Sequence, residues 1–296
     1  MEATNTVRKI GIVGYGCLGK YLVQKLLETP TVEGIDYQIA FIWNRTSERI
    51  RQDLPPQHHG LILEDLNLFE ERGADLIIEV SHPNIVAEFG ERFTHHADFL
   101  VGSPTAFADD DLTARIKAKA TRHALYIAVG ALWAANDIKR LALQGQLSSL
   151  VISMTKPASS LKVLSPLDET LRDLIEAQKR SGDIPDEFVV FDGPVKELCP
   201  LAPNNVNTMA AAALAASSVL SFDQVRGRLL ASNVSSEHKI VVEVFGPPRD
   251  DGERFHVRVE RHNPAAVGAV TGSATYGSFY VSLLLAHGQT SGFHFC

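Results

Sequence analysis

The sequence predicts an α/β fold: an N-terminal Rossmann domain with a doubly wound parallel sheet, then a second α+β domain built on a mixed, largely antiparallel sheet. Three observations support this prediction. A glycine-rich loop follows a short apolar strand near the N-terminus. Strand-like and helical segments then alternate as far as Gly130, as they do in parallel sheets. After Gly130 the strand-like runs are longer and helices are few, which is typical of antiparallel sheets.

The first half contains short apolar or β-rich runs separated by helical patterns. The first run ends in glycine, as a buried parallel strand does before a nucleotide-binding turn. The helical patterns begin at turn or cap residues and repeat apolar side chains at helical spacing. The expected strands are 9–14, 37–43, 74–80, 98–101 and 124–129, and the expected helices are 18–27, 84–93 and 109–121.

The second half combines longer strands with two helices, and the last apolar stretch, 279–287, is expected to return as a helix to the first domain. We therefore divide the chain into a dinucleotide-binding domain (1–133 plus 268–296) and a substrate and dimerisation domain (134–267). Because open sheets need cover, we expect a homodimer formed through residues 150–260. The expected strands are 150–155, 188–191, 240–245 and 255–259, and the expected helices are 168–180 and 207–217.

Composition and charge narrow the class of partner. The chain has 296 residues, of which 45% are hydrophobic and 21% charged, values typical of globular proteins. Its net charge of −7 argues against a nucleic-acid partner and against binding to anionic membranes. No apolar run approaches the roughly 18–20 residues needed to span a bilayer. The partner that remains is a small-molecule substrate.

Cysteine usage indicates a reducing compartment. Cys17, Cys199 and Cys296 are too few and too scattered for a disulfide framework, and no cysteine or histidine cluster has the spacing of a metal site. The polar residues 1–8 lack the apolar segment of a signal peptide. We therefore expect reduced thiols, no bound metal and a cytoplasmic location.

Gly14, Gly16 and Gly19 form a Gly-x-Gly-x-x-Gly motif between the first strand and the first helix. In this context the motif predicts a dinucleotide site. Gly14 permits the tight turn, Gly16 permits close approach of a pyrophosphate, and Gly19 lets the helix pack on the strand. Cys17 and Leu18 open the helix, whose N–H groups attract the anion. These five residues are therefore the expected pyrophosphate site.

The tip of the second strand carries Asn44, Arg45 and Thr46 where an acidic residue usually binds the ribose of NAD. Asn44 can hydrogen-bond a ribose hydroxyl, and Arg45 with Thr46 can bind a 2′-phosphate. The alternative for Arg45 is a solvated surface side chain. The sequence therefore predicts NAD or NADP as the cofactor and leaves the choice between them open.

Three further segments carry a family resemblance: the small pair Gly130-Ala131, the amide-rich run 205–211, and His238 at the start of a strand. With the glycine motif and an Asn263-Pro264 turn, they resemble the L-aspartate dehydrogenase family over most of the chain. The resemblance implies NAD(P)-dependent oxidative deamination of L-aspartate to iminoaspartate, which hydrolyses to oxaloacetate and ammonia. The chain departs from compact microbial relatives in an apparent insertion at 157–185 and in lacking the acidic ribose residue.

The resemblance also implies residue roles. Ala131 and Asn207 would contact the cofactor near its nicotinamide, with Asn205 as the alternative to Asn207, and His238 would be catalytic. A histidine suits the reaction because water must attack an iminium, and a base with a pKa near neutrality removes the proton of that water. We therefore expect His238 to titrate near neutrality.

The two carboxylates of aspartate need cationic partners. Spacing does not choose among the candidates in the second half, which are Lys156, Lys162, Lys196, Arg226, Arg228 and Lys239.

Two other hypotheses remain open. A related two-domain oxidoreductase could act on another small substrate, such as homoserine or a cyclic imine. The paired Lys and Asp catalysts or the His-His-x-x-Lys stretch of such enzymes do not occur after residue 130. The third hypothesis is an NAD(P)-binding sensor or scaffold without turnover, which the fold by itself does not distinguish from an enzyme.

Overall fold

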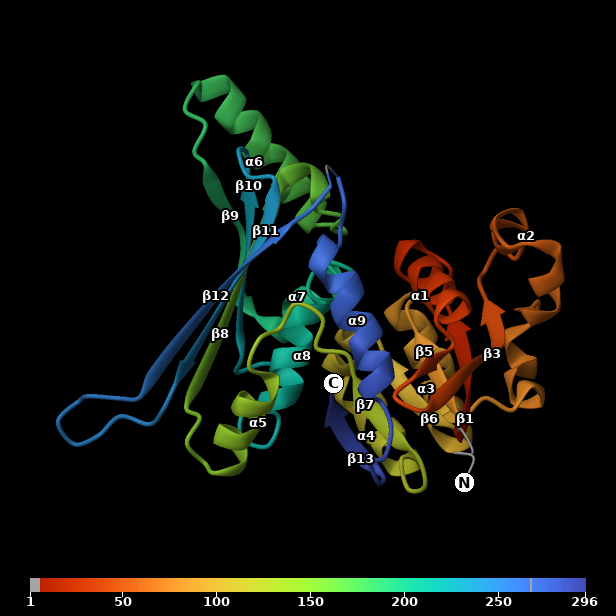
Figure 1. The fold of residues 1–296 in the computed structure, drawn as a ribbon. Coiled ribbons are helices and arrows are strands. Elements are labelled where there is room, and N and C mark those ends of the chain that lie inside the picture. The colour runs from red at the N-terminus through yellow and green to blue at the C-terminus, as the bar shows by residue number, and fades with distance from the viewer. Residues whose placement is uncertain (1–5, 267) are drawn as a thin grey trace.

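The computed structural model describes residues 6–266 and 268–296, which form two β-sheets with helices on and between them (Figure 1). The first sheet has eight strands in the order β13-β7-β6-β5-β1-β3-β2, with β4 paired to β3. All neighbours run parallel except β2, which is antiparallel to β3. The strands are β1 (Thr6–Val13), β2 (Thr31–Val32), β3 (Ile35–Trp43), β4 (Ile62–Leu63), β5 (Leu76–Glu79), β6 (Asp98–Val101), β7 (Ala124–Ile127) and β13 (Gly292–Phe295).

Helices cover both faces of this sheet, which makes it doubly wound. On one face lie α1 (Cys17–Glu28) and α9 (Ser273–Leu285), and on the other lie α3 (Pro83–His96) and α4 (Asp110–Lys119). Since α9 contacts both α1 and the second sheet, the C-terminal segment joins the two halves of the chain. The remaining helical elements of this half are α2 (Glu48–Asp53) and the 3-10 turns η1 (Pro56–Leu61), η2 (Leu66–Arg72) and η3 (Pro104–Ala108).

The second sheet has five strands in the order β12-β11-β8-β10-β9. β8 and β10 are parallel and the other pairs are antiparallel, so the sheet is mixed and largely antiparallel. Its edge strands are β12 and β9. The strands are β8 (Ser149–Pro157), β9 (Glu187–Pro194), β10 (Arg226–Ser232), β11 (Glu237–Phe245) and β12 (His256–Pro264).

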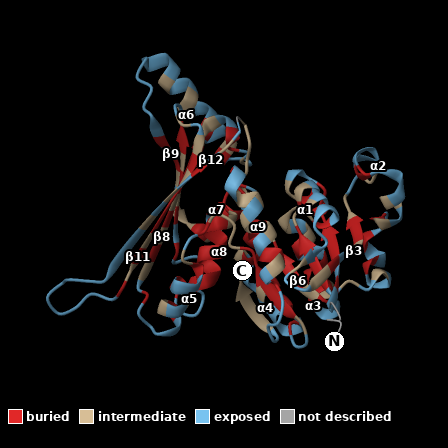
Figure 2. Cartoon of the chain, in the orientation of Figure 1, coloured by how far each residue is buried: buried red, intermediate tan, exposed pale blue. Residues whose placement is uncertain are grey.

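Three helices lie between the sheets: α5 (Ala135–Leu143), α7 (Val195–Leu201) and α8 (Asn207–Ala216). α8 is buried along its length, as Figure 2 shows, and its alanines let neighbouring backbones approach closely. A Cβ on Gly227 of β10 would lie 2.9 Å from the Sδ atom of Met209. The other helical elements are α6 (Leu167–Ser181), which projects from one end of the sheet, and the turn η4 (Ala158–Ser160).

The predicted fold class is confirmed, and each predicted strand and helix occurs, most of them within a few residues of the expected bounds. Three parts of the prediction were wrong or incomplete. The strands β2, β4, β10 and β13, the helices α2, α5 and α7, and the 3-10 turns were missed. The last helix begins six residues earlier, at Ser273. The residues Asn263-Pro264 end β12 instead of forming a turn, because the ladder with β11 continues through the Glu237–Pro264 pair.

In the part of the chain that the structure describes, no helix is long and apolar enough to cross a bilayer. Within the same residues, no three histidine, cysteine, aspartate or glutamate side chains gather closely enough to hold a metal ion.

Candidate functional site

Two cavities lie at the carboxyl edge of the parallel sheet. The inner cavity, of ≈ 110 Å³, is enclosed by residues of both halves of the chain. The outer cavity, of ≈ 390 Å³, lies over the glycine loop and the tip of β3. Of the predicted site residues, Leu18, Ala131, Asn207 and His238 line the inner cavity, and Gly14, Gly16, Asn44 and Arg45 line the outer one. The two remaining predicted residues, Cys17 and Gly19, line neither cavity.

The glycine loop has the geometry that a pyrophosphate needs. Gly14 has a φ of +117°, and a Cβ on Gly19 would lie 2.0 Å from the carbonyl oxygen of Gly14, so the fold itself requires both glycines. A Cβ on Gly16 would meet nothing within 4 Å. α1 begins beside it with no side-chain cap on its N–H groups. A helix N-terminus of this kind attracts anions, so the loop fits the pyrophosphate of a dinucleotide.

The tip of β3 is organised by Asn44. Its Oδ1 atom accepts a hydrogen bond from the Tyr15 backbone N–H at 3.2 Å, and its Nδ2 atom donates to the Thr46 carbonyl at 3.1 Å. The amide therefore ties the glycine loop to the turn after β3. Its contact with a ribose stays a prediction.

Two arginines border the outer cavity. Arg45 and Arg49 are both exposed, and neither forms a salt bridge with another residue that the structure describes. No aspartate or glutamate is among the residues that line this cavity. Arg49 was missed by the sequence analysis because its position depends on α2, one helical turn beyond Arg45. A cavity with two unpaired guanidinium groups and no carboxylate suits a phosphate ligand.

A buried carboxylate fixes the neighbouring loops. Glu79, at the end of β5, accepts hydrogen bonds from the backbone N–H and hydroxyl groups of Ser81 and Ser103 at 2.7–3.0 Å. Burial raises the pKa of Glu79, and these hydrogen bonds oppose that shift. Next to Ser81, His82 caps α3 through a hydrogen bond from Asn84 and also lines the outer cavity. The turns after β5 and β6 are therefore held together behind the cavities.

The floor of the inner cavity is the segment after β7. Gly130 has a φ of +56°, which favours glycine, and its carbonyl accepts a hydrogen bond from Ser278 of α9 at 2.8 Å. Ala131 follows with a side chain small enough to leave the space open. The segment therefore leaves space for a flat ring near Gly130 and Ala131, and the contact of Ala131 with a nicotinamide stays a prediction.

Asn205 and Asn207, which the sequence left as alternatives, both line the inner cavity. Asn207 begins α8, and its Oδ1 atom accepts a hydrogen bond from Thr105 at 3.4 Å. Asn205 is buried, and its Nδ2 atom donates to the Lys162 carbonyl at 2.7 Å. The two amides therefore have different surroundings, and only Asn207 stands at a helix N-terminus facing the first sheet.

Two buried polar atoms in the inner cavity lack hydrogen-bond partners among the described residues. They are the Nε2 atom of His238 and the Oδ1 atom of Asn263, in side chains that are 4% and 1% exposed. Asn263 faces His238 across β11 and β12, and its Nδ2 atom donates to the His238 carbonyl at 3.3 Å, which leaves Oδ1 as the free acceptor. Unpaired buried polar atoms are costly, so this pair indicates a cavity built for a polar ligand.

The expected titration of His238 near neutrality is wrong for the free protein. Burial, followed by the nearby charge of Lys156, lowers the pKa of His238 to about 4, and a backbone hydrogen bond with Ala269 only partly opposes this. The imidazole is therefore neutral at pH 7. The signal for this shift was not in the local sequence, because it comes from burial and from a lysine on another strand.

Of the six candidate cations, only Lys156 lines the inner cavity. It is 3% exposed, and burial lowers its pKa to about 7. Lys162 is exposed. The others form salt bridges outside the cavity: Lys196 with Asp110 and Asp223, Arg226 and Arg228 with Asp192, and Lys239 with Glu187.

Comparisons with known proteins identify the family of the chain. A family model described as "Aspartate dehydrogenase, C-terminal" matches residues 137–282, and one described as "Homoserine dehydrogenase, NAD binding domain" matches residues 14–130. A protein of Danio rerio named "Aspartate dehydrogenase domain-containing protein" is 45% identical over 97% of this chain and 98% of its own length. An "L-aspartate dehydrogenase" of Methanocaldococcus jannaschii is 26% identical over 70% of this chain and 74% of its own length.

Solved structures share the fold. The crystal structure of aspartate dehydrogenase from Thermotoga maritima covers 96% of this chain and 99% of its own, with a TM-score of 0.64 and 18% identity. A hyperthermophilic archaeal homoserine dehydrogenase in complex with NADPH covers 97% of this chain and 100% of its own, with a TM-score of 0.52 and 14% identity. At these identities the likeness concerns the fold alone.

Proposed function

The chain belongs to the aspartate dehydrogenase family, and from that premise we propose that it catalyses the NAD(P)-dependent oxidative deamination of L-aspartate. It is an oxidoreductase of the dehydrogenase type that binds NAD or NADP. The products would be oxaloacetate and ammonia, released when water hydrolyses iminoaspartate. Relatives that carry the name L-aspartate dehydrogenase support this choice of substrate.

One observation carries the proposal: a single buried cavity gathers a free imidazole nitrogen, a free amide oxygen and a lysine. His238, Asn263 and Lys156 supply these groups, and Gly130-Ala131 borders the same space. An amino acid with a carboxylate side chain offers matching groups, because its amine donates and its carboxylates accept hydrogen bonds. Such a site discriminates by leaving its polar atoms unpaired when the wrong ligand enters.

The residues that line the inner cavity have different roles in the proposed reaction. The bound nicotinamide would accept the hydride from the substrate Cα. The Oδ1 atom of Asn263 would accept a hydrogen bond from the substrate amine and orient it. The Nε2 atom of His238, neutral at pH 7, would then remove a proton from the water that attacks the imine carbon. Residues of α9 such as Phe279 would limit further water, since they border the cavity.

The test is an assay of aspartate-dependent reduction of NAD+ and NADP+ by the purified protein, followed by absorbance of the reduced nicotinamide. We expect turnover with L-aspartate and little with D-aspartate, L-glutamate or L-homoserine. Turnover with L-homoserine alone would instead assign the second hypothesis. Tight cofactor binding without turnover of any of these amino acids would assign the sensor or scaffold hypothesis.

We also propose the domain division 1–133 plus 268–296 and 134–267. β7 ends at Ile127 and α5 begins at Ala135, and the returning segment packs α9 and β13 on the first half. A cytoplasmic location is part of the proposal, since the cysteines are free thiols.

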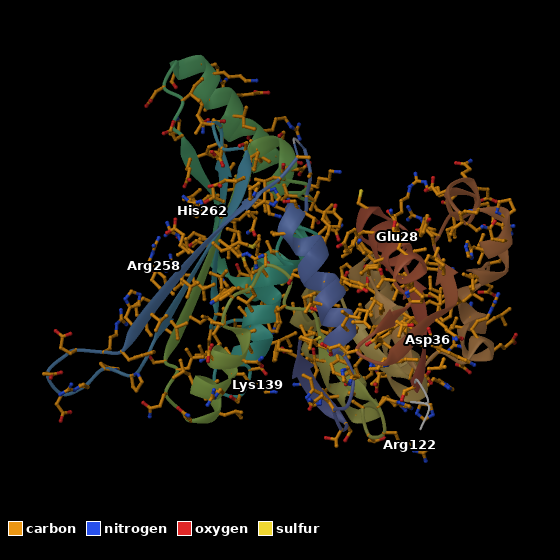
Figure 3. All side chains as sticks on the ribbon, in the orientation of Figure 1. Glu28, Asp36, Arg122, Lys139, Arg258 and His262 are labelled. Atoms are coloured by element: carbon orange, nitrogen blue, oxygen red, sulfur yellow. The ribbon has the colours of Figure 1, made fainter. Side chains whose placement is uncertain are left out.

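A homodimer through the outer face of the second sheet completes the proposal. Among the described residues no helix covers this face, and Figure 3 shows Arg258 and His262 on it, on the side opposite α8. By strand register, Arg258 stands in one row with Glu243, Val151 and Arg226. A face that mixes both signs of charge with apolar side chains can match a second copy of itself about a two-fold axis.

A further inference from the structure

The inner cavity holds a buried lysine, Lys156, that no carboxylate of the described residues pairs with. The Nζ atom of Lys156 donates hydrogen bonds to the carbonyl oxygens of Asn205 at 3.0 Å and Val270 at 3.1 Å, and a longer one to Asn205 Oδ1 at 3.4 Å. All three acceptors are neutral. No aspartate or glutamate is among the residues that line the cavity. A buried ammonium group with only neutral partners is costly, and an anion that enters the cavity removes that cost.

The charged groups around Lys156 do not supply the missing anion. On the neighbouring strand β11 lies His238, whose imidazole is neutral at pH 7. From β12, Arg261 reaches the Gly130 carbonyl at 3.4 Å, and its charge is also positive. Glu79, a buried carboxylate of the first half, does not line the cavity and accepts hydrogen bonds from Ser81 and Ser103. The helices α8 and α9 and the segment after β7 contribute only uncharged side chains to the cavity.

We propose that Lys156 binds a carboxylate of the substrate, and that this carboxylate brings a proton onto Lys156 and makes His238 a stronger base. The proposal rests on the proposed function for the dicarboxylate nature of the substrate. The residue roles follow from the cavity itself.

The three hydrogen bonds of the Lys156 ammonium group indicate which of its N–H groups would bind the ligand. The Nδ2 atom of Asn205 donates a hydrogen bond to the Lys162 carbonyl, and this contact holds the Oδ1 atom of Asn205 toward Lys156. The contact with Oδ1 is the longest of the three and therefore the weakest. A carboxylate offers a stronger, charge-assisted acceptor for this third N–H while the two backbone carbonyls keep the ammonium in place.

Two linked titrations follow. The pKa of Lys156 is about 7 in the free protein, so above neutrality most molecules lack this proton. A carboxylate in contact raises that pKa, and binding above pH 7 therefore takes up a proton. The charge of Lys156 is also one of the causes that lower the pKa of His238. When a carboxylate neutralises that charge, the pKa of His238 rises and its Nε2 atom becomes more basic.

The experiment measures binding of succinate, the four-carbon dicarboxylate without an amine, to the full chain saturated with NADP+. Calorimetry at pH 8 in buffers with different ionisation enthalpies counts protons, and we expect uptake approaching one proton per site. Lys156→Met should abolish the uptake and weaken binding about 10- to 100-fold, the loss of one charged hydrogen bond. Lys156→Arg should bind without uptake, because arginine keeps its proton.

Lys162→Met is the matched control, since Lys162 is exposed and lies outside the cavity. It should leave affinity and proton uptake unchanged. Binding of succinate to the wild type without proton uptake, uptake that persists in Lys156→Met and Lys156→Arg, or no binding at millimolar succinate would each overturn the proposal. If Lys156→Met does not fold, the comparison of wild type with Lys156→Arg decides.

A second readout follows His238 directly. By NMR of the histidine ring, its pKa should rise when succinate binds, and it should already be raised in unliganded Lys156→Met. A merely structural role of Lys156 would move neither value in this direction. Succinate is not turned over, so its binding is measured separately from the reaction. Proton uptake on succinate binding without aspartate oxidation would reject the proposed reaction and support the role of Lys156. Aspartate oxidation without proton uptake on succinate binding would support the reaction and reject the role of Lys156.

Discussion

Lys156 and His238 are cross-strand neighbours, each one residue beyond the Lys239–Thr155 pair with which the ladder of β11 and β8 ends. Both side chains enter the inner cavity, and the charge of the lysine lowers the pKa of the histidine. Burial and, after it, this charge together explain why an imidazole that the sequence places near neutrality has a pKa of about 4 and is neutral at pH 7. Burial also places the titration nearest to pH 7 on the lysine.

Gly16→Val should abolish binding of NAD and NADP and leave the fold intact. Gly16 has φ −80° and ψ −165°, which valine tolerates, and its Cβ would project into open space where the pyrophosphate approaches. Calorimetry should detect no binding at concentrations that saturate the wild type, with an unchanged melting temperature. Gly19→Ala is the contrasting variant: its Cβ meets the Gly14 carbonyl and should lower the melting temperature. Normal NADP affinity in folded Gly16→Val contradicts the assigned site.

Arg45→Ala and Arg49→Ala should each weaken NADP more than NAD. Each variant removes a charged partner of the 2′-phosphate, which only NADP carries, so the loss should be about 10- to 100-fold for NADP. For NAD we expect little change. Fluorescence or calorimetric titration of both cofactors gives the comparison. Arg51→Ala is the matched control because Arg51 pairs with Glu64 outside the cavity. Equal losses for NAD and NADP would remove the arginines from this role.

His238→Ala should lower turnover by about 10²- to 10⁴-fold, the usual cost of losing a general base. Cofactor affinity should not change. In the free enzyme the imidazole loses its proton above a pKa of about 4, so kcat/KM should fall on acidification only near that value. On the alkaline side it should fall above about pH 7, as Lys156 loses the proton that binds the carboxylate. Exposed His95, as His95→Ala, is the control. Turnover of His238→Ala within about threefold of wild type, well short of the general-base range, would exclude the role.

The stability of the protein should rise with pH relative to Lys156→Met. The pKa of Lys156 is about 7 when folded and about 10.4 when unfolded, so between these values the unfolded chain binds the extra proton. Wild type should therefore gain up to about 1.4 kcal/mol per pH unit over the variant as pH rises through this window. Below pH 7 the difference should be constant. Urea unfolding of both proteins at a series of pH values measures the slope, and a flat difference would show that Lys156 titrates normally.

Leu230→Asp should convert the proposed dimer to a monomer. Leu230 is half-buried on the outer face of the second sheet, in the row of Thr155 and Lys239, and a carboxylate there opposes burial against a second copy. Light scattering at tens of micromolar reports the mass, and cofactor binding should be unaffected. Val234→Asp is the control, because Val234 lies in the exposed connection between β10 and β11. A wild-type monomer under these conditions would reject the dimer.

Local patterns in the sequence were sufficient for much of the fold. The glycine motif, the alternation of the first half and the alanine-rich helix are each decided within a few residues, because turn geometry, helical periodicity and strand length are local properties. The strands that were missed are those whose identity depends on partners. β10 alternates Arg226 and Arg228 with a glycine, and β13 has only four residues; pairing with β8 and β7 makes them strands.

The sequence by itself determined the family resemblance, the dinucleotide loop and the candidates His238, Ala131 and Asn207. Only the tertiary structure showed which of the six candidate cations, Lys156, lines the inner cavity, and that Arg49 lines the outer cavity together with Arg45. It also showed that the pKa of His238 is lowered from neutrality. The physical reason is that burial and charge proximity are set by segments far apart in the chain. A side chain's residue type fixes what chemistry it can perform, and the surrounding fold fixes its protonation state and its partners.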